Sequence, residues 1–197
     1  NIVQSDNLIL VDLACLGVPS ITVYKKYVSE TFPGQSITHT NFRSKTIGWK
    51  AYSVEYWSNG YLVRSNLNVN DLFLCGFSPQ CLYFNEACYE CKFNTIPRCG
   101  DITLADYWGV PKELDNKLGV SAIFTNNEKA DKLLKEINAT FLPQPLEQIL
   151  NGTPRLNRAG HVKKPKNRIF FFIHLEDKSF DELAKLYYKR SNKIVLL

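Results

Sequence analysis

The six cysteines are the residues of this sequence whose types and spacing most clearly suggest a chemical site. Five of them, at positions 75, 81, 88, 91 and 99, lie close together in the chain, and the sixth is Cys15. Cys88 and Cys91 form a CxxC pair, which is the spacing at which one turn of chain presents two thiolates to one metal ion or cluster. Lys92 beside the pair and Arg98 nearby favour the thiolate forms. The segment therefore predicts a site built on thiolates.

Three kinds of thiol site compete for this pattern. A disulfide framework is typical of small secreted domains with weak cores, whereas this chain has 197 residues, is 45% hydrophobic and shows no signal-peptide pattern. A zinc ribbon requires a second CxxC or nearby His partners, and the three His, at 39, 161 and 174, are scattered. A [4Fe-4S] cluster accepts a CxxC pair together with thiolates from distant loops. Cys15 is the natural distant donor, because it ends the first expected strand.

Strand and helix patterns must position these thiols. The apolar run 7–15 predicts a strand covered on both faces, and Ser20 is the expected N-cap of a helix over 21–32. Asn59-Gly60 between two alternating runs predicts a β-hairpin. Further strands are expected at 37–42 and 119–126, and further helices at 127–137 and 179–190. The fold class is therefore α/β of the mixed α+β type: a mixed sheet with flanking helices, a β-hairpin insertion and a cysteine-rich loop.

Length and charge limit the function classes. A chain of 197 residues is expected to form a single domain over 1–197. Its 24 Lys and Arg against 19 Asp and Glu give a net charge of +5, a smaller excess than nucleic-acid binders usually carry. No apolar run approaches the roughly 20 residues of a membrane span. Because the sequence opens on Asn1 and contains no Met, we expect a piece of a longer chain, and because no signal-peptide pattern precedes the first strand, we expect it in the cytoplasm.

Two basic groups are candidates for binding. Arg43, Lys45, Trp49 and Lys50 suit a phosphate or a flavin ring, although such a hairpin face is commonly only solvated. The stretch 151–168 is expected to be a basic loop within the domain, suited to RNA or to an acidic partner through Arg155, Arg158, His161, Lys163, Lys164, Lys166 and Arg168. Because no aromatic residue interleaves these cations, a solvated loop is favoured and no nucleic-acid partner is expected.

Five stretches of the chain carry a resemblance to a known family. They are DLACLGVPS (12–20), FRSKTIGWKAYS (42–53), CYECKF (88–93), RCGDITLADYWGV (98–110) and GVSAIFTNNEKADKLL (119–134). In this order they resemble the C-terminal part of the coenzyme F-420 hydrogenase/dehydrogenase beta-subunit family, whose members are flavin and iron–sulfur proteins. The resemblance implies an electron-transfer oxidoreductase domain that carries a [4Fe-4S] cluster close to a flavin.

The resemblance also implies which residues bind the cluster. It makes Cys15, Cys88 and Cys91 ligands. The family's usual fourth cysteine belongs to a motif upstream of the DLxCxGVPS strand that this sequence does not contain, so the fourth ligand is that upstream cysteine, Cys81 or Cys99. We carry Cys99 forward as the fourth candidate.

The same resemblance implies a loop, cofactors and partners. Residues 100–109 are expected to be a loop that packs on the cluster and is oriented by Asp101 and Asp106, although these two carboxylates would equally serve only to cap and turn it. The flavin is expected to be FAD in preference to FMN. The expected partners are a redox partner protein or an upstream ferredoxin-like domain, and a deazaflavin or another small electron acceptor.

A departure from the family pattern keeps other hypotheses open. Leu16 stands where relatives commonly carry His, a residue that can tune a cluster or relay a proton. With the missing fourth ligand, it supports a structural or zinc-stabilised scaffold of a polysaccharide-biosynthesis assembly without redox activity. An RNA-binding module that uses the basic loop is a third hypothesis, and it predicts steep salt dependence of RNA retention.

Overall fold

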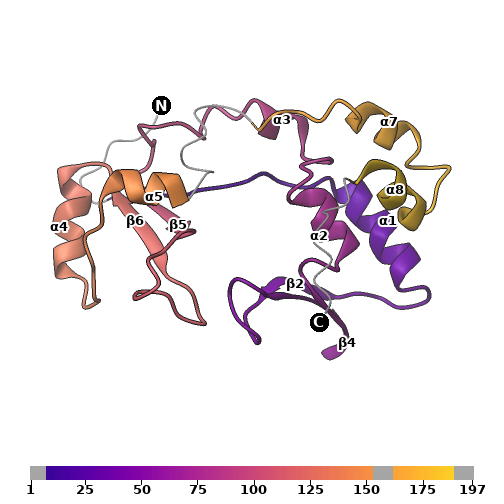
Figure 1. Ribbon diagram of the computed structural model, residues 1–197, viewed down its shortest axis with the longest axis horizontal. Helices are drawn as coiled ribbons and strands as arrows, with labels where there is room; N and C mark the ends of the chain where they lie inside the picture. Colours follow the sequence, from indigo (N-terminus) through magenta and orange to yellow (C-terminus); the bar gives the residue numbers. More distant parts are fainter. Residues whose placement is uncertain (1–7, 153–161, 189–197) are drawn as a thin grey trace. The chain divides into compact units, whose positions relative to one another are not determined.

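The computed structural model describes residues 8–152 and 162–188, and the chain divides into two compact units (Figure 1). Among the described residues, unit 1 consists of 8–16 and 90–152, and unit 2 consists of 17–89 and 162–188. Each unit has its own sheet, so the mixed α+β class expected from the sequence is confirmed.

The sheet of unit 1 is mixed. Its strands are β1 (Val11–Leu13), β5 (Ile102–Asp106) and β6 (Ser121–Thr125), in the order β1-β5-β6. β1 runs parallel to β5, with Asp12 opposite Thr103, and β6 runs antiparallel to β5. The expectation of a loop across 100–109 is therefore wrong for 102–106. This stretch is the central strand, because both of its edges find hydrogen-bonding neighbours.

The apolar run 7–15 predicts a strand that is covered on both faces, and this prediction is wrong for β1. Val11 and Leu13 are 55% and 64% exposed, while Asp12 between them is partly buried. β1 also lies at the edge of the sheet, where β5 is its neighbour among the described strands. Because side chains alternate along a strand, the covered face of β1 is the one that holds its single charge.

Two helices complete the described part of unit 1. α4 (Glu128–Glu136) packs against β6 and is N-capped by Asn127, whose side chain accepts a hydrogen bond from the Ala130 N–H. α5 (Leu146–Gly152) follows, so the first two residues of the stretch 151–168 are helical rather than loop. Residues 153–161 of that stretch lie outside the described residues.

The sheet of unit 2 is an antiparallel meander. It consists of β2 (His39–Ser44), β3 (Ser53–Ser58) and β4 (Tyr61–Leu67) in that order. Asn59 and Gly60 connect β3 and β4 with φ angles of 49° and 84°, which are the positive values that a two-residue hairpin turn requires. The hairpin predicted from the sequence is confirmed.

Five described helices accompany that sheet in unit 2. They are α1 (Ile21–Thr31), α2 (Leu72–Phe77), α3 (Glu86–Tyr89), α7 (Arg168–Ile173) and α8 (Phe180–Tyr187). Ser20 precedes α1 as predicted, but its side chain makes no capping hydrogen bond. Ser179 begins α8 with a capping box, in which it and Glu182 satisfy each other's backbone N–H groups.

An aromatic core fills unit 2. Its members come from α1, β3, α2, α7, α8 and the loops beside them, and they include Tyr27, Tyr56, Phe73, Tyr83 and Phe171. One carboxylate, Asp71, is fully buried among them. No helix among the described residues is long and apolar enough to cross a membrane.

Candidate functional site

The candidate ligand cysteines are divided between the two units. Cys15, Cys91 and Cys99 belong to unit 1 and Cys88 belongs to unit 2, so the division of the chain falls inside the CxxC pair. All six cysteines are free thiols, with Cys15 and Cys99 exposed and Cys88 and Cys91 partly buried. Within residues 8–152 and 162–188, no three His, Cys, Asp or Glu side chains gather closely enough to hold a metal ion. The ligand assignment therefore remains a prediction.

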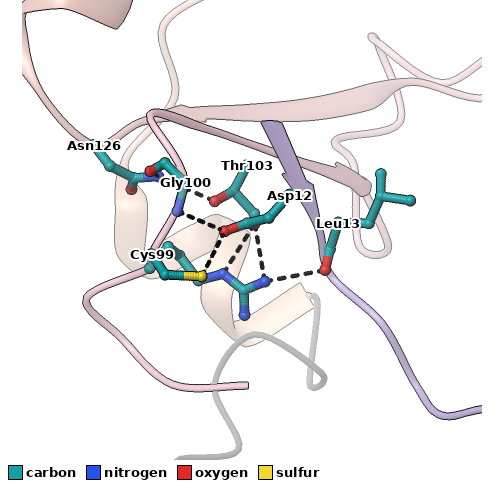
Figure 2. A network of polar contacts seen from close by, with 7 residues as sticks. Asp12, Leu13, Cys99, Gly100, Thr103 and Asn126 are labelled. Carbon is teal, nitrogen blue, oxygen red and sulfur yellow. Dashed lines mark hydrogen bonds and ion pairs between the residues drawn. The ribbon is translucent and has the colours of Figure 1, made fainter. Parts of the chain in front are cut away.

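In unit 1, the carboxylate of Asp12 is the centre of a polar network (Figure 2). Its Oδ1 accepts hydrogen bonds from Nη2 and Nε of Arg98 at 2.9 and 3.2 Å. Nη2 also donates to the Leu13 carbonyl at 3.0 Å. The side chains of Arg98 and Asp12 are only 7% and 19% exposed, so this ion pair is shielded from solvent more than a surface pair is.

The second oxygen of Asp12 holds the chain at the candidate ligand Cys99. It accepts hydrogen bonds from the Gly100 N–H at 3.0 Å and from the Cys99 thiol at 3.7 Å. Burial of Asp12 opposes its ionisation, but hydrogen bonds from Arg98, Thr103 and Gly100 outweigh that effect and lower the pKa of this carboxyl below its usual value. In this contact Cys99 donates its proton, so metal ligation by Cys99 would replace the S–H···O contact.

Asn126 and Asp101 hold the neighbouring backbone. Asn126 donates from Nδ2 to the Gly100 carbonyl at 2.9 Å and to the Thr103 hydroxyl at 3.1 Å (Figure 2). Asp101 accepts from the Leu10 N–H at 2.7 Å and from the Asn127 side chain at 2.6 Å, and these contacts lower its pKa. Both contacts join elements of unit 1, which favours the structural interpretation of Asp101. Asp106, the other predicted carboxylate, ends β5.

In unit 2, the loop after Leu16 lies against the segment that carries Cys88. The Val18 N–H donates to Cys88 Sγ at 3.3 Å. Backbone hydrogen bonds flank this contact: Asn85 N–H to the Val18 carbonyl at 2.8 Å, and Ser20 N–H to the Tyr83 carbonyl at 2.7 Å. The sulfur of Cys88 therefore already accepts the kind of amide hydrogen bond that ligand thiolates accept.

Arg168 anchors the helix that bears Cys88. It bonds Glu86 at 2.8 Å, the Phe84 carbonyl at 3.0 Å and the Tyr89 hydroxyl at 3.2 Å. Lys164 adds a second ion pair to Glu86 at 2.8 Å, and the Lys164 hydrogen bond is the largest cause of the lowered pKa of Glu86. These two cations of the predicted basic loop therefore have structural partners. Arg155, Arg158 and His161 lie outside the described residues.

The predicted flavin-binding group lies on and after β2. Arg43 stacks over the Tyr52 ring at 4.9 Å, and Lys50 lies over the Trp49 ring at 5.4 Å. Lys45 is exposed, whereas Trp49 is buried. Because its indole is packed inside unit 2, Trp49 offers little surface on which a flavin ring could stack.

A cavity of about 1040 Å³ opens in unit 1 along β6. Most of its lining is apolar, contributed by β6, by residues 139–143 and by α5, and Arg98 and Asn126 add polar groups. A cavity of this size and lining suits an organic ligand better than an ion. The Asp12–Arg98 pair thus connects the wall of this cavity to the Cys99 thiol and the Gly100 N–H.

Sequence reasoning missed the partners of Asp12 and Arg168. Asp12 did carry a signal, because a single charge inside an apolar strand requires a partner. The identity of that partner was hidden, since Arg98 lies 86 residues away. Arg168 looked like one cation of a polar loop, and only the structure shows it over the rings of Tyr89 and Phe172.

Comparison with known proteins identifies the family. Residues 1–142 match the family model that describes the C terminus of the beta subunit of coenzyme F420 hydrogenase/dehydrogenase. This range contains all six cysteines and both sheets. A comparison with curated proteins gave no match. Because the family match covers 142 of the 197 residues, the chain belongs to the coenzyme F-420 hydrogenase/dehydrogenase beta-subunit family.

Proposed function

We propose that this chain is an electron-transfer domain that carries a [4Fe-4S] cluster on Cys15, Cys88 and Cys91. Family membership supports the coarser statement, a redox domain of the beta-subunit type. The observation that carries the finer one is the hydrogen bond from the Val18 N–H to Cys88 Sγ. Free, partly exposed thiols are also the donors that iron–sulfur clusters require.

Cys99 is the better candidate for a fourth ligand from within this sequence. Cys81 is buried, and its thiol donates to the Pro79 carbonyl at 3.5 Å. Cys99 is exposed, and its contact with Asp12 is a weak S–H···O bond. Ligation by Cys99 would break that contact, while the same oxygen of Asp12 would still accept from the Gly100 N–H.

A flavin, FAD in preference to FMN, is the second proposed cofactor. A flavin exchanges one or two electrons and a cluster exchanges one, so the pair converts hydride-type transfer into single-electron steps. Arg43, Lys45 and Lys50 are one candidate contact surface, and the cavity along β6 is the other. The proposed partners are a redox protein or a ferredoxin-like domain, and a deazaflavin or another small acceptor, in the cytoplasm.

Anaerobic purification followed by iron, sulfide, zinc and flavin analysis tests the cluster. We expect about four irons and four sulfides per chain, with loss of both in Cys88→Ser and Cys91→Ser. Cys75→Ser is the matched control, because burial and the nearby Asp71 charge raise the pKa of Cys75 and its thiol donates to the Val69 carbonyl at 3.3 Å. Zinc without iron, or no metal, would overturn the proposal in favour of the scaffold.

Flavin retention separates the two candidate surfaces. Lys45→Ala removes an exposed cation beside β2, whereas Ala139→Trp places a large side chain at the wall of the cavity. Loss of flavin absorbance in the first variant alone supports the basic group, and loss in the second alone supports the cavity. A protein that contains no flavin before substitution would overturn this part of the proposal.

A further inference from the structure

The loop Gly17–Pro19 approaches the Cys88 segment more closely than a side chain would permit. A Cβ added at Gly17 would lie 2.6 Å from Cδ2 and 2.7 Å from Cε2 of Phe84. Phe84 cannot easily retreat, because it is fully buried and its ring packs against Phe77 and Tyr89 at centroid distances of 5.0 and 5.7 Å. Position 17 therefore requires glycine for space.

The close packing of this loop on Phe84 also places the Val18 amide beside the Cys88 sulfur. Pro19 forms an isolated β-bridge with Phe84, and Val18 between Gly17 and Pro19 donates its N–H to Cys88 Sγ at 3.3 Å. The Val18 carbonyl accepts from the Asn85 N–H, so both polar groups of this residue face the Cys88 segment. A shift of the loop by about an ångström would lengthen the N–H···S contact beyond hydrogen-bonding distance.

We infer that Gly17 is a positioning residue for Cys88: its lack of a side chain lets the loop pack on Phe84 and hold the Val18 N–H on the Cys88 sulfur. The inference rests on the proposed function in that Cys88 is there a cluster ligand. Amide hydrogen bonds to ligand sulfurs stabilise the more negative, reduced state of a cluster and so raise its reduction potential. The loop thereby both orients the ligand and tunes the potential.

Hydrogen exchange at the Val18 amide tests the contact without any cofactor. In the metal-free protein we expect Cys88→Ala, which removes the acceptor, and Gly17→Ala, which displaces the loop, each to lower the protection of this amide roughly fivefold. Adding Phe84→Leu to Gly17→Ala should restore part of the protection, because the flexible side chain can turn away. Gly48→Ala is the matched control, since Gly48 has a φ of +140° near the +157° of Gly17 but no atom within 4 Å of its added Cβ.

Unchanged protection of Val18 in Cys88→Ala would overturn the inference, and this variant answers the question even if Gly17→Ala does not fold. The second readout is the midpoint potential of the reconstituted cluster, followed by its electron paramagnetic resonance signal. Gly17→Ala should lower that potential and Gly48→Ala should leave it unchanged. A protein that binds no iron refutes the proposed function, whereas one that binds iron with the same potential in Gly17→Ala refutes the role of Gly17.

Discussion

Each unit builds a network around one aspartate, and the two networks differ in the charge of their partners. In unit 2, Asp71 is fully buried and accepts from the hydroxyls of Tyr27 and Tyr56 at 3.0 and 2.8 Å. It also N-caps α2 by accepting from the Leu74 N–H at 2.8 Å. In unit 1, Asp12 is only partly buried and pairs with a cation, Arg98, and with the Cys99 thiol.

The difference in partners separates a network that stabilises the core from a network that depends on solution conditions. The hydroxyl and amide partners of Asp71 are neutral. Burial, and to a smaller extent the Asp71 charge, raises the pKa values of Tyr27 and Tyr56, so both hydroxyls stay protonated across the physiological range. The contacts of Asp12 include an ion pair and a thiol, and they lie on a segment with candidate cluster ligands. The contacts of Asp71 are therefore insensitive to pH in the physiological range, whereas the Asp12 network includes contacts that depend on pH, salt and ligation.

Removal of the Asp71 carboxylate should have the largest effect. Asp71→Ala leaves two buried tyrosine hydroxyls without an acceptor and removes the cap of α2, so we expect a loss of about 4 kcal/mol in the free energy of unfolding. Urea denaturation measures it. Asp71→Asn keeps the volume and one acceptor oxygen and should cost less than half as much. Equal losses in the two variants would contradict this expectation, because they would show that neither the retained volume nor the one remaining acceptor oxygen replaces the carboxylate.

Breaking the Asp12–Arg98 pair should cost less, about 2 kcal/mol, because Asp12 keeps some contact with water. Arg98→Met retains the apolar stem and leaves the carboxylate without its cation. Asp12→Asn in the same background should recover part of the loss, with a coupling energy of at least about 1 kcal/mol in a double-mutant cycle. Additive losses would mean that Arg98 acts through its bond to the Leu13 carbonyl instead.

The two aspartates also mark what the sequence could predict. Short-range signals succeeded: Asn59-Gly60 predicted the hairpin, and the helix expected over 179–190 is present as α8, with Ser179 as its N-cap. Both networks join distant residues, with Asp71 bonded to Tyr27 across 44 positions, and no local pattern reports such a contact. The central strand β5 was missed for the same reason, since its neighbours β1 and β6 determine it rather than its own composition.

The cysteines show the same limit within the candidate site. The CxxC spacing of Cys88 and Cys91 is local and visible in the sequence. The amide on Cys88 comes from Val18, 70 positions earlier, and the carboxylate on Cys99 comes from Asp12, 87 positions earlier. The sequence thus names candidate ligands, while the groups that orient and tune them appear only in the folded chain.

The contribution of Asp12 to the free energy of unfolding should depend on pH. Its pKa is lowered in the folded state, so its contribution is complete above the unfolded value of roughly 3.9 and is lost as the pH falls through the lower, folded value. Between pH 6 and pH 3, Asp12→Asn should therefore lose less unfolding free energy than the parent protein. Urea titrations at several pH values measure this difference. Parallel pH profiles would contradict the ionic character of the Asp12 network.

The smallest expected difference between the two networks is in how salt changes their contributions to stability. Screening weakens an ion pair in proportion to its exposure, and it leaves bonds between a buried carboxylate and neutral hydroxyls almost unchanged. Raising NaCl from about 0.05 to 1 M should thus reduce the cost of Arg98→Met by less than about 1 kcal/mol and leave the cost of Asp71→Asn constant. The exposed Lys164–Glu86 pair is the reference, because Lys164→Met should cost little at low salt and nothing measurable at high salt. Suppose that the loss of unfolding free energy in Arg98→Met were as independent of salt as that in Asp71→Asn. The Asp12 network would then also stabilise the core independently of solution conditions, and the two units would differ only in the residues that bind their aspartates.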